Sequence, residues 1–399
     1  MIHLDPDRYL TVSLISKERK ALLEHTTAVD SSILENIRYS SSISLTEFEM
    51  EPFLTALEYE IQRAPTPKRA KILRRLRERL AALSNFRPAP TDSVGLASSL
   101  PEDMLAGWQF DSLADLNRHL RNQMDAHNRR PDPEMGGLSP SQVSLLIHSD
   151  WDDPDEALRF NDYLSPSDVA GSRFYQNVRV FLESLLNEEE STATAKGNLN
   201  RRFVRLMTEK MQWPAGDLEE LQSVCKVLNE QDVFALHIVR VICACASLIV
   251  RWKTKFLVTK KAKDLLAEGK AGQLFTLLFK TYMRKFNLAY LDRLPPCHCL
   301  QATIAYSLYR LAALTSEWRS IDSLVPNILL PKVRQDITKE LPSLVEPEWL
   351  IRARIIRPLE DFGLLECAYQ DRDIPLIRMP NKVKKTDLFD KFLAFSLDA

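Results

Sequence analysis

Glycine is unusually scarce in this sequence, at 10 of 399 residues, whereas glycine makes up about 7% of an ordinary protein. Glycine supplies the positive-φ turns and the close backbone approaches on which phosphate-binding loops depend. The patterns G-x-x-x-x-G-K-[ST], G-x-G-x-x-G and H-E-x-x-H do not occur. We therefore do not expect a nucleotide-binding α/β enzyme, and no catalytic residue is nominated.

The composition is that of a soluble globular protein. Apolar residues make up 45% and charged residues 27%, and 53 basic residues balance 54 acidic ones for a net charge of −1. A length of 399 residues corresponds to two or three domains. The sequence has no run of 18 uncharged apolar residues and no signal peptide at its start. We expect a cytoplasmic protein with no membrane contact, no cofactor and six reduced cysteines.

Residues 1–90 are expected to form an N-terminal helical region. After a polar, serine-rich start, apolar residues recur at three- and four-residue spacing in 52–61 and again in 68–83. The second helix is basic, with seven basic residues against one glutamate between Lys68 and Arg79. Its apolar stripe can pair with a helix of the same chain, or with a protein partner or second copy through 68–83. Alternatively, its arginines are only a solvated surface.

Residues 91–172 are expected to hold a linker and capped helices around an acidic loop. The prolines of 88–101 indicate the linker. Ser139-Pro140-Ser141-Gln142 has the N-cap serine, first-turn proline and third-position glutamine of a capping box, and Ser165-Pro166-Ser167-Asp168 repeats the pattern. The acidic loop at 150–156 lacks the glycine and the final glutamate of an EF-hand, so we expect a solvated loop and no metal.

The segment 173–290 combines helices with a short β-hairpin. Helices are expected at 174–186 and 232–246. Apolar and polar residues then alternate on both sides of the turn Lys253-Thr254-Lys255, as in a half-buried hairpin. A basic helix is expected to follow at 260–267.

The segment 291–399 repeats this order after a helical connection. The expected helix at 349–357 is followed by strands at 363–369 and 374–379, joined by a turn at 371–373, and by a last helix at 386–395. Pro375 would confine the second strand to a sheet edge. The expected fold is therefore mainly α with short β-hairpins.

The order of helix, hairpin and basic helix resembles the winged-helix superfamily over residues 174–399. Ser247–Trp252 and Phe256–Ala262 look like the wing and exit helix of bacterial members, and Thr194–Gly197 looks like a partial copy of the same junction. The resemblance implies tandem winged-helix-like units after the N-terminal helical region. The stretches 128–140 and 195–200 are also similar to uncharacterised bacterial proteins, and no function is attached to that similarity.

Local charge supplies the argument for nucleic-acid binding. Between residues 251 and 286, ten basic side chains are opposed by two acidic ones, for a net of +8 at the wing and exit helix, where phosphate contacts fall in this architecture. The sequence predicts a non-enzymatic, regulatory protein that contacts nucleic-acid phosphates. The basic residues assigned to this role are Arg251, Lys253, Lys255, Lys260, Lys261, Lys263, Arg201, Arg202, Arg205, Arg352 and Arg354.

One helix argues against sequence-specific DNA recognition. The helix before the wing reads apolar nearly all round, with His237 and Arg240 among its few polar residues, which indicates burial and not exposure to a major groove. Winged helices also serve as protein-docking modules, because a fold does not define a function. A protein-interaction or scaffold role without nucleic acid is therefore the alternative.

Two further patterns, one of possible metal ligands and one of aromatic residues, can each be interpreted either as part of the core or as a binding site. Cys297-His298-Cys299 holds three possible metal ligands, but adjacent residues rarely converge on one ion, so structural thiols are favoured and metal binding stays open. The aromatic residues from Phe275 to Tyr290 follow helical spacing, which favours core packing over a base-stacking platform.

Overall fold

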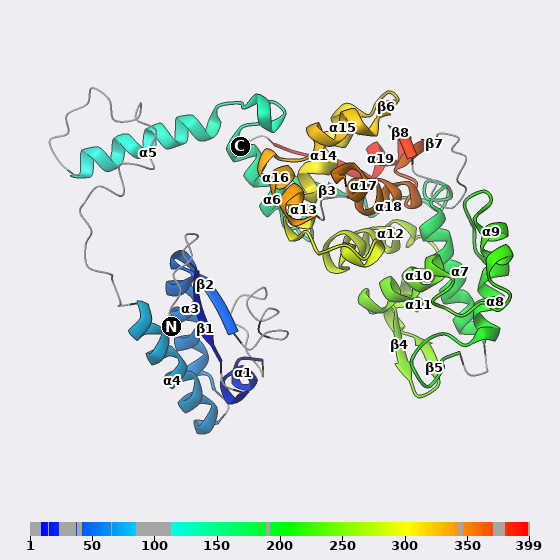
Figure 1. Ribbon diagram of the computed structural model, residues 1–399, viewed down its shortest axis with the longest axis horizontal. Coiled ribbons are helices and arrows are strands. Elements are labelled where there is room, and N and C mark those ends of the chain that lie inside the picture. Colours follow the sequence, from blue (N-terminus) through cyan, green and yellow to red (C-terminus); the bar gives the residue numbers. More distant parts are fainter. Residues whose placement is uncertain are drawn as a thin grey trace. The chain divides into compact units, whose positions relative to one another are not determined.

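The computed structural model divides the chain into two compact units, Met1–Gln109 and Phe110–Ala399 (Figure 1). In the described residues, no helix is long and apolar enough to cross a membrane. The linker expected at 88–101, the turn at 371–373 and the strand at 374–379 with Pro375 lie outside the described residues. The structure describes residues 9–14, 16–23, 37, 42–64, 66–84, 113–188, 192–341, 346–369 and 380–397.

The N-terminal unit combines an antiparallel pair of strands with helices. The two expected helices form, and α3 packs against α4. The strands were not expected, because their partners lie far apart in the sequence and no tight turn joins them. Tyr9 pairs with Thr46, and Ser13 with Ser42. The elements of this unit are β1 (Tyr9–Ser13), α1 (Ser16–Leu23), β2 (Ser42–Thr46), α3 (Glu47–Gln62) and α4 (Pro67–Ser84).

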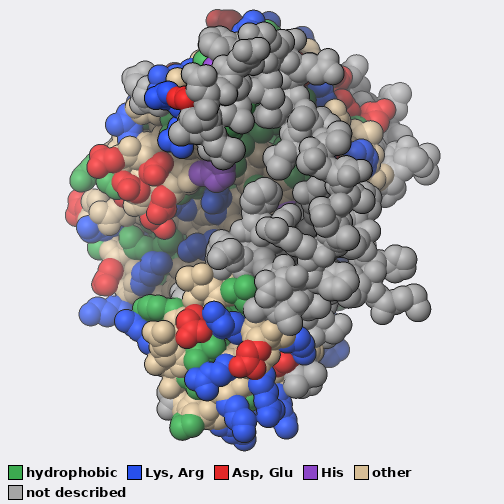
Figure 2. All heavy atoms as spheres, turned by 90° about the vertical axis from the view of Figure 1, so that its left-hand side faces the viewer, with side chains coloured by type: hydrophobic (Ala, Val, Ile, Leu, Met, Phe, Trp, Pro, Cys, Tyr) green, Lys and Arg blue, Asp and Glu red, His purple; other side chains and the backbone are tan. Residues whose placement is uncertain are grey.

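The apolar stripe of α4 is used inside its own unit. Leu73, Leu76 and Leu80 are fully buried with Leu57 of α3, so the stripe is not available to a second copy in this fold. Of the pairings left open for the stripe of 68–83, the structure shows the one within the same chain, and self-association stays a prediction. Lys68, Lys71, Arg74 and Arg75 of α4 are exposed, whereas Arg69 is buried and pairs with Glu60. Figure 2 shows one face of the molecule, on which Lys and Arg side chains gather at the lower end.

The C-terminal unit is mainly helical with small antiparallel sheets, which confirms the expected class of helices with short β-hairpins. The α-helices are α5 (Leu113–Arg129), α6 (Pro140–His148), α7 (Arg173–Asn187), α8 (Arg201–Lys210), α9 (Asp217–Val224), α10 (Phe234–Cys245), α11 (Lys260–Leu266), α12 (Ala271–Lys280), α13 (His298–Ala302), α14 (Ile304–Leu314), α15 (Ile321–Ile328), α16 (Pro331–Glu340), α17 (Pro347–Ile351), α18 (Arg357–Asp361) and α19 (Asp387–Phe392). The short 3-10 and π segments are η2 (Pro133–Met135), η3 (Thr281–Lys285), η4 (Leu288–Leu291) and η5 (Arg352–Ile356).

Three small sheets complete this unit. The end of the chain differs from expectation, because the last helix stops at Phe392 and Leu393–Phe395 become a strand that pairs with β3. Leu393 is buried in that pairing. The sheets are β3 (Leu158–Phe160) with β9 (Leu393–Phe395), β4 (Ile249–Trp252) with β5 (Lys255–Val258), and β6 (Arg319–Ser320), β8 (Pro380–Lys385) and β7 (Leu365–Tyr369) in that order.

Of the two capping patterns, only the first begins a helix. Ser139 Oγ accepts a hydrogen bond from Gln142 N–H, and Gln142 Oε1 accepts one from Ser139 N–H, at the start of α6. Ser165 and Asp168 make the same reciprocal bonds, but the chain continues as turns and the next helix begins after the Ser172 cap. The second expected helix start is therefore wrong. The capping hydrogen bonds form there without a helix. Only a few residues separate Asp168 from Ser172, which caps the next helix, so the chain has no room for a full helix between them.

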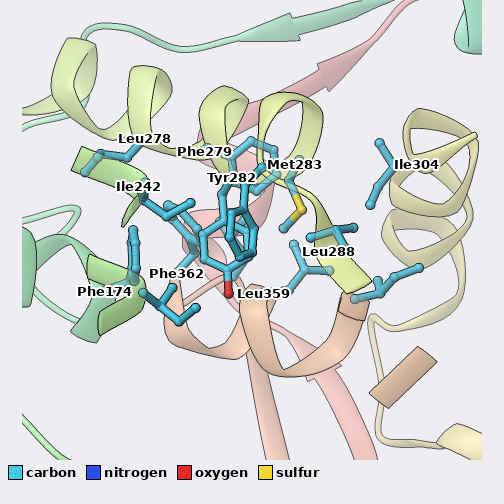
Figure 3. Packing of buried hydrophobic residues seen from close by; sticks show 14 of the residues in the cluster. Phe174, Ile242, Leu278, Phe279, Tyr282, Met283, Leu288, Ile304, Leu359 and Phe362 are labelled. Atoms are coloured by element: carbon cyan, nitrogen blue, oxygen red, sulfur yellow. The ribbon is translucent and has the colours of Figure 1, made fainter. Parts of the chain in front are cut away.

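Among the described residues of the C-terminal unit, one hydrophobic core contains side chains from Leu138 to Leu393. Figure 3 shows its centre, where side chains of α7, α10, α12, η3 and α18 meet. The ring centroids of Phe174 and Phe362 lie 4.9 Å apart. Within the aromatic pattern, Phe275, Phe279, Tyr282 and Phe286 are buried, which confirms the expected core packing, but Tyr290 is half exposed.

Candidate nucleic-acid interface

Residues 173–266 place the basic hairpin at the end of a three-helix assembly. Helices α7, α8 and α10 pack on one another, and α7 also packs against β5. Between α7 and α8, the backbone passes beside the hairpin: Ala193 N–H donates to Thr254 O at 2.8 Å, and Phe256 N–H donates to the Thr192 hydroxyl at 2.9 Å. In Figure 1 the hairpin projects from the edge of the C-terminal unit.

The hairpin turns tightly and has two unlike surfaces. Trp252 pairs with Lys255, so Lys253 and Thr254 form a two-residue turn, one residue shorter than expected, and Lys253 has a positive φ of 53°. Side chains alternate across a strand pair. Ile249 and Phe256 therefore anchor the inner surface, with 3% and 6% exposure. The outer surface is formed by Val250, Trp252, Lys255 and Leu257.

Helix α11 follows the hairpin directly because Thr259 caps it. The Thr259 hydroxyl accepts a hydrogen bond from Ala262 N–H at 3.2 Å and donates one to Ser247 O at 2.9 Å. Ala262 is buried, whereas Lys260, Lys261 and Lys263 are exposed. Thr259 therefore ties the start of α11 to the start of the hairpin, and the lysines of both elements are held together.

Six of the predicted phosphate-binding residues lie on these two elements. Lys253, Lys260 and Lys263 are exposed side chains of the turn and of α11. The guanidinium of Arg251 donates to the carbonyls of Thr194 and Ala195. Lys261 Nζ donates to Ala246 O at 3.1 Å, at the C-terminal end of α10, where a cation is favourable. We call this group the hairpin cluster: Arg251, Lys253, Lys255, Lys260, Lys261 and Lys263.

Three more predicted residues lie on α8. Arg201, Arg202 and Arg205 are exposed. Arg201 Nε donates to Asn229 Oδ1 at 2.9 Å, and Arg205 pairs with Glu209 one turn along the helix. These arginines present positive charge on a different helix from the hairpin cluster, within the same three-helix assembly.

The last two predicted residues lie elsewhere, in η5. Arg354 is only 1% exposed and is paired with the buried carboxylate of Asp292, so it is a core residue and not a phosphate contact. This corrects its assignment. Arg352 is partly buried, pairs with Asp322 and donates to Pro380 O at 3.0 Å. Both arginines are used in holding η5 to neighbouring segments.

Helix α10 is covered on its polar side by a hydrogen-bond network that the sequence did not reveal. His237 Nδ1 lies 2.6 Å from Glu230 Oε1, and His237 Nε2 lies 2.7 Å from the Tyr290 hydroxyl. Glu230 also accepts bonds from Arg240 and from Leu199 N–H. The two polar residues of α10 are therefore engaged within the fold, because Glu230, just before α10, and Tyr290, from the distant η4, close over them.

The charge state of Glu230 follows from this network. Burial alone would raise the pKa of its carboxyl, but the hydrogen bonds from His237, Leu199 N–H and Arg240 outweigh burial and lower the pKa below its ordinary value. Glu230 is therefore a carboxylate near neutral pH, and it can hold the histidine and the arginine of α10 in place.

The side chains of Cys297, His298 and Cys299 do not converge on one point, and they differ in burial. Cys297 is buried and its thiol donates to Glu340 at 3.2 Å, whereas His298 is exposed. Burial, together with the Glu340 carboxylate, raises the pKa of the Cys297 thiol to about 12. Across the described ranges, no group of three His, Cys, Asp or Glu side chains is placed to hold a metal ion.

Comparison with known proteins matches the part of the chain that holds the hairpin cluster. Residues 170–271 match the Y4jL N-terminal domain. The uncharacterised protein y4jL of Sinorhizobium fredii (strain NBRC 101917 / NGR234) is 34% identical over 90 residues, which are 23% of this chain and 40% of that relative. The chain thus matches less than half of the relative's length. No solved structure matches this chain.

The matched range begins just before α7 and ends at the first residue of α12. It contains the stretch 195–200, whose similarity to uncharacterised bacterial proteins is thereby supported. The three-helix assembly, the hairpin and α11 all lie within the range that matches the Y4jL N-terminal domain.

Proposed function

We propose that residues 173–266 form a winged-helix-like unit that binds nucleic-acid phosphates through the hairpin cluster. The single observation that carries this proposal is the concentration of charge: residues 249–266 contain six basic side chains and one acidic one, Asp264. Lys253, Lys260 and Lys263 of this group are exposed. Closely spaced cations of this kind attract the phosphate backbone.

The order of elements supports the winged-helix part of the proposal. The chain order is α7, a short extended segment at 192–193 beside the hairpin, then α8, α9 and α10, and then β4–β5. A winged helix has helices followed by such a hairpin, with a further extended segment beside it. A second unit of this kind at 291–399, where α17–α18 precede β7 and β8, belongs to the same proposal.

The burial of α10 limits what such a unit can recognise. Leu236, Val239 and Ile242 are in the core, and His237 and Arg240 are held by Glu230. Reading a base sequence in a major groove needs exposed polar side chains on the inserted helix. We therefore expect binding through phosphates with little dependence on sequence.

Charge reversal at the exposed lysines tests the proposal. Fluorescence anisotropy measures the affinity of the whole chain for 20-nucleotide single-stranded and duplex DNA and RNA at about 50 mM salt. Replacing Lys253, Lys260 and Lys263 together by glutamate is expected to abolish most binding and to reduce the slope of log K against log salt by about 2 to 3, because each phosphate contact contributes about 0.7 to 0.9.

The matched control reverses three exposed basic residues of the C-terminal unit that lie outside both proposed winged-helix-like units, Arg121, Arg129 and Arg130. Both triple variants change the net charge equally, so a non-specific charge effect would weaken binding in both. Equal losses in the two variants would contradict a local site. No binding of the unmodified chain to any of the four nucleic acids would remove the proposal.

A protein-interaction module is the second candidate. It is favoured by Val224 and Val227, which are 70% and 56% exposed at the end of α9 and just after it, inside the range shared with y4jL. Exposed apolar side chains such as these can be covered by a protein partner. If the chain binds none of the four nucleic acids, this candidate replaces the first one.

A further inference from the structure

The hairpin exposes a large aromatic side chain at its tip. Trp252, the last residue of β4, is 64% exposed. Burying an aromatic side chain of this size is strongly favourable, and the inner surface of the same hairpin does bury Phe256. The outer surface therefore leaves an indole ring in solvent where a binding partner can cover it.

The neighbours of Trp252 are cationic and apolar. Lys255 lies directly opposite it across the strand pair, and Lys253 follows it in the turn. Directly opposite side chains in an antiparallel pair have Cβ atoms about 5 Å apart. Val250 and Leu257 form the next pair on the same surface and are 52% and 42% exposed. An aromatic ring thus lies between lysines, with an apolar surface behind it.

We infer that the hairpin binds single-stranded nucleic acid, with an unpaired base stacked on Trp252 and the adjoining phosphates on Lys253 and Lys255. The inference rests on the proposed function and specifies its substrate class. Single-strand-binding proteins combine cations along the backbone with aromatic rings on which bases stack. A base in a duplex is already stacked on both sides and cannot use the ring.

The burial of α10 supports the same choice. A duplex would be read by the helix before the hairpin, but the polar side of that helix is closed by Glu230 and Tyr290. The hairpin and α11 remain exposed and carry the lysines. Contacts through these two elements suit a flexible strand, because a strand can bring both a base and its phosphates to one small surface.

Substitution of Trp252 separates this inference from general phosphate binding. The full-length chain, Trp252→Ala and Trp252→Phe are titrated with a 20-nucleotide mixed-sequence single strand and with the duplex of the same sequence, as DNA and as RNA. Loss of one base-stacking contact is expected to weaken single-strand binding about 5- to 100-fold in Trp252→Ala. Duplex affinity is expected to stay within about twofold, and Trp252→Phe is expected to recover most of the loss, because it keeps an aromatic ring.

Trp318 provides a matched control in the C-terminal unit, since it is 44% exposed and lies outside the hairpin. Trp318→Ala is expected to leave both affinities unchanged. Single strands should also quench the tryptophan fluorescence of the unmodified chain and of Trp318→Ala, and the quenching should be lost in Trp252→Ala. This second readout reports directly on contact with the indole.

The outcomes distinguish the two levels of the proposal. Equal weakening of single-strand and duplex binding by Trp252→Ala, or no effect on either, would overturn the single-strand inference. If the single-strand inference were overturned in this way but the charge-reversed variant of Lys253, Lys260 and Lys263 still lost binding, the proposal of phosphate binding would stand on its own. Absence of binding to every strand and duplex would overturn both.

Discussion

Arg354 and Asp292 form a two-point ion pair in the interior of the C-terminal unit. Arg354 Nε lies 2.7 Å from Asp292 Oδ2, and the terminal guanidinium nitrogen lies 2.8 Å from Oδ1. The two side chains are 1% and 0% exposed. The same guanidinium donates to the carbonyls of Leu294 and Pro295, so one side chain attaches the segment after η4 to η5.

Arg354→Ala is expected to lower the free energy of unfolding by about 3–5 kcal/mol, because it leaves the Asp292 carboxylate buried without its partner. Urea denaturation at pH 7 measures the change. Arg352→Ala is the matched control, since its partner Asp322 is 71% exposed, and it should cost about 1 kcal/mol or less. Similar losses in the two variants would contradict a special role for the buried pair.

Glu230→Gln is expected to destabilise the protein at pH 7 by about 3–5 kcal/mol, because Arg240 and His237 lose a buried carboxylate partner. The pKa of Glu230 is lower in the folded chain than its ordinary value of 4.5. The stabilisation is therefore complete above that ordinary value and is lost as the pH falls through the folded pKa.

Urea denaturation of both proteins at pH 7 and pH 3 tests this pH dependence. The stability difference between the unmodified chain and Glu230→Gln should shrink at pH 3. Glu209→Gln, which alters an exposed pair with Arg205, should show little difference at either pH. If the stability difference between the unmodified chain and Glu230→Gln is the same at both pH values, the lowered pKa of Glu230 in the folded chain is refuted.

Ser139→Ala is expected to cost about 1 kcal/mol, because the first turn of α6 loses the capping oxygen that accepts the Gln142 N–H bond. Ser144→Ala changes an exposed serine within the same helix and should stay within about 0.5 kcal/mol. Thermal or urea denaturation measures both. Equal effects would mean that the capping box adds no stability.

Leu76→Ala is expected to lower the stability of the N-terminal unit by about 2–5 kcal/mol, because it leaves a cavity between α3 and α4. Hydrogen exchange of the amides of α3 and α4 measures this unit separately. Arg75→Ala, an exposed neighbour on α4, is the control. A change of oligomeric mass in sedimentation, with unchanged exchange in α3 and α4, would instead restore the intermolecular role of the stripe.

Local pattern predicted the helices and the hairpin well, because each depends on neighbours in the sequence. The alternation around Lys253 predicted β4 and β5, and the Ser139–Gln142 spacing predicted the start of α6. The Ser165 pattern failed even though its capping bonds form, since a helix also needs room to continue. The strands β1 and β9 were missed, because each pairs with a segment far away in the chain.

The composition and spacing of the chain were enough to establish a mainly helical protein with few glycine-dependent loops and a concentration of lysines at one hairpin. The tertiary structure decided how each basic residue is used. Arg354 could not be told from the other arginines in the sequence but lies against Asp292 in the core. Trp252 is a strand residue as predicted, but only the tertiary structure shows that its side chain lies in solvent. Burial depends on which distant segment packs against a residue, and that contact leaves no local pattern in the sequence.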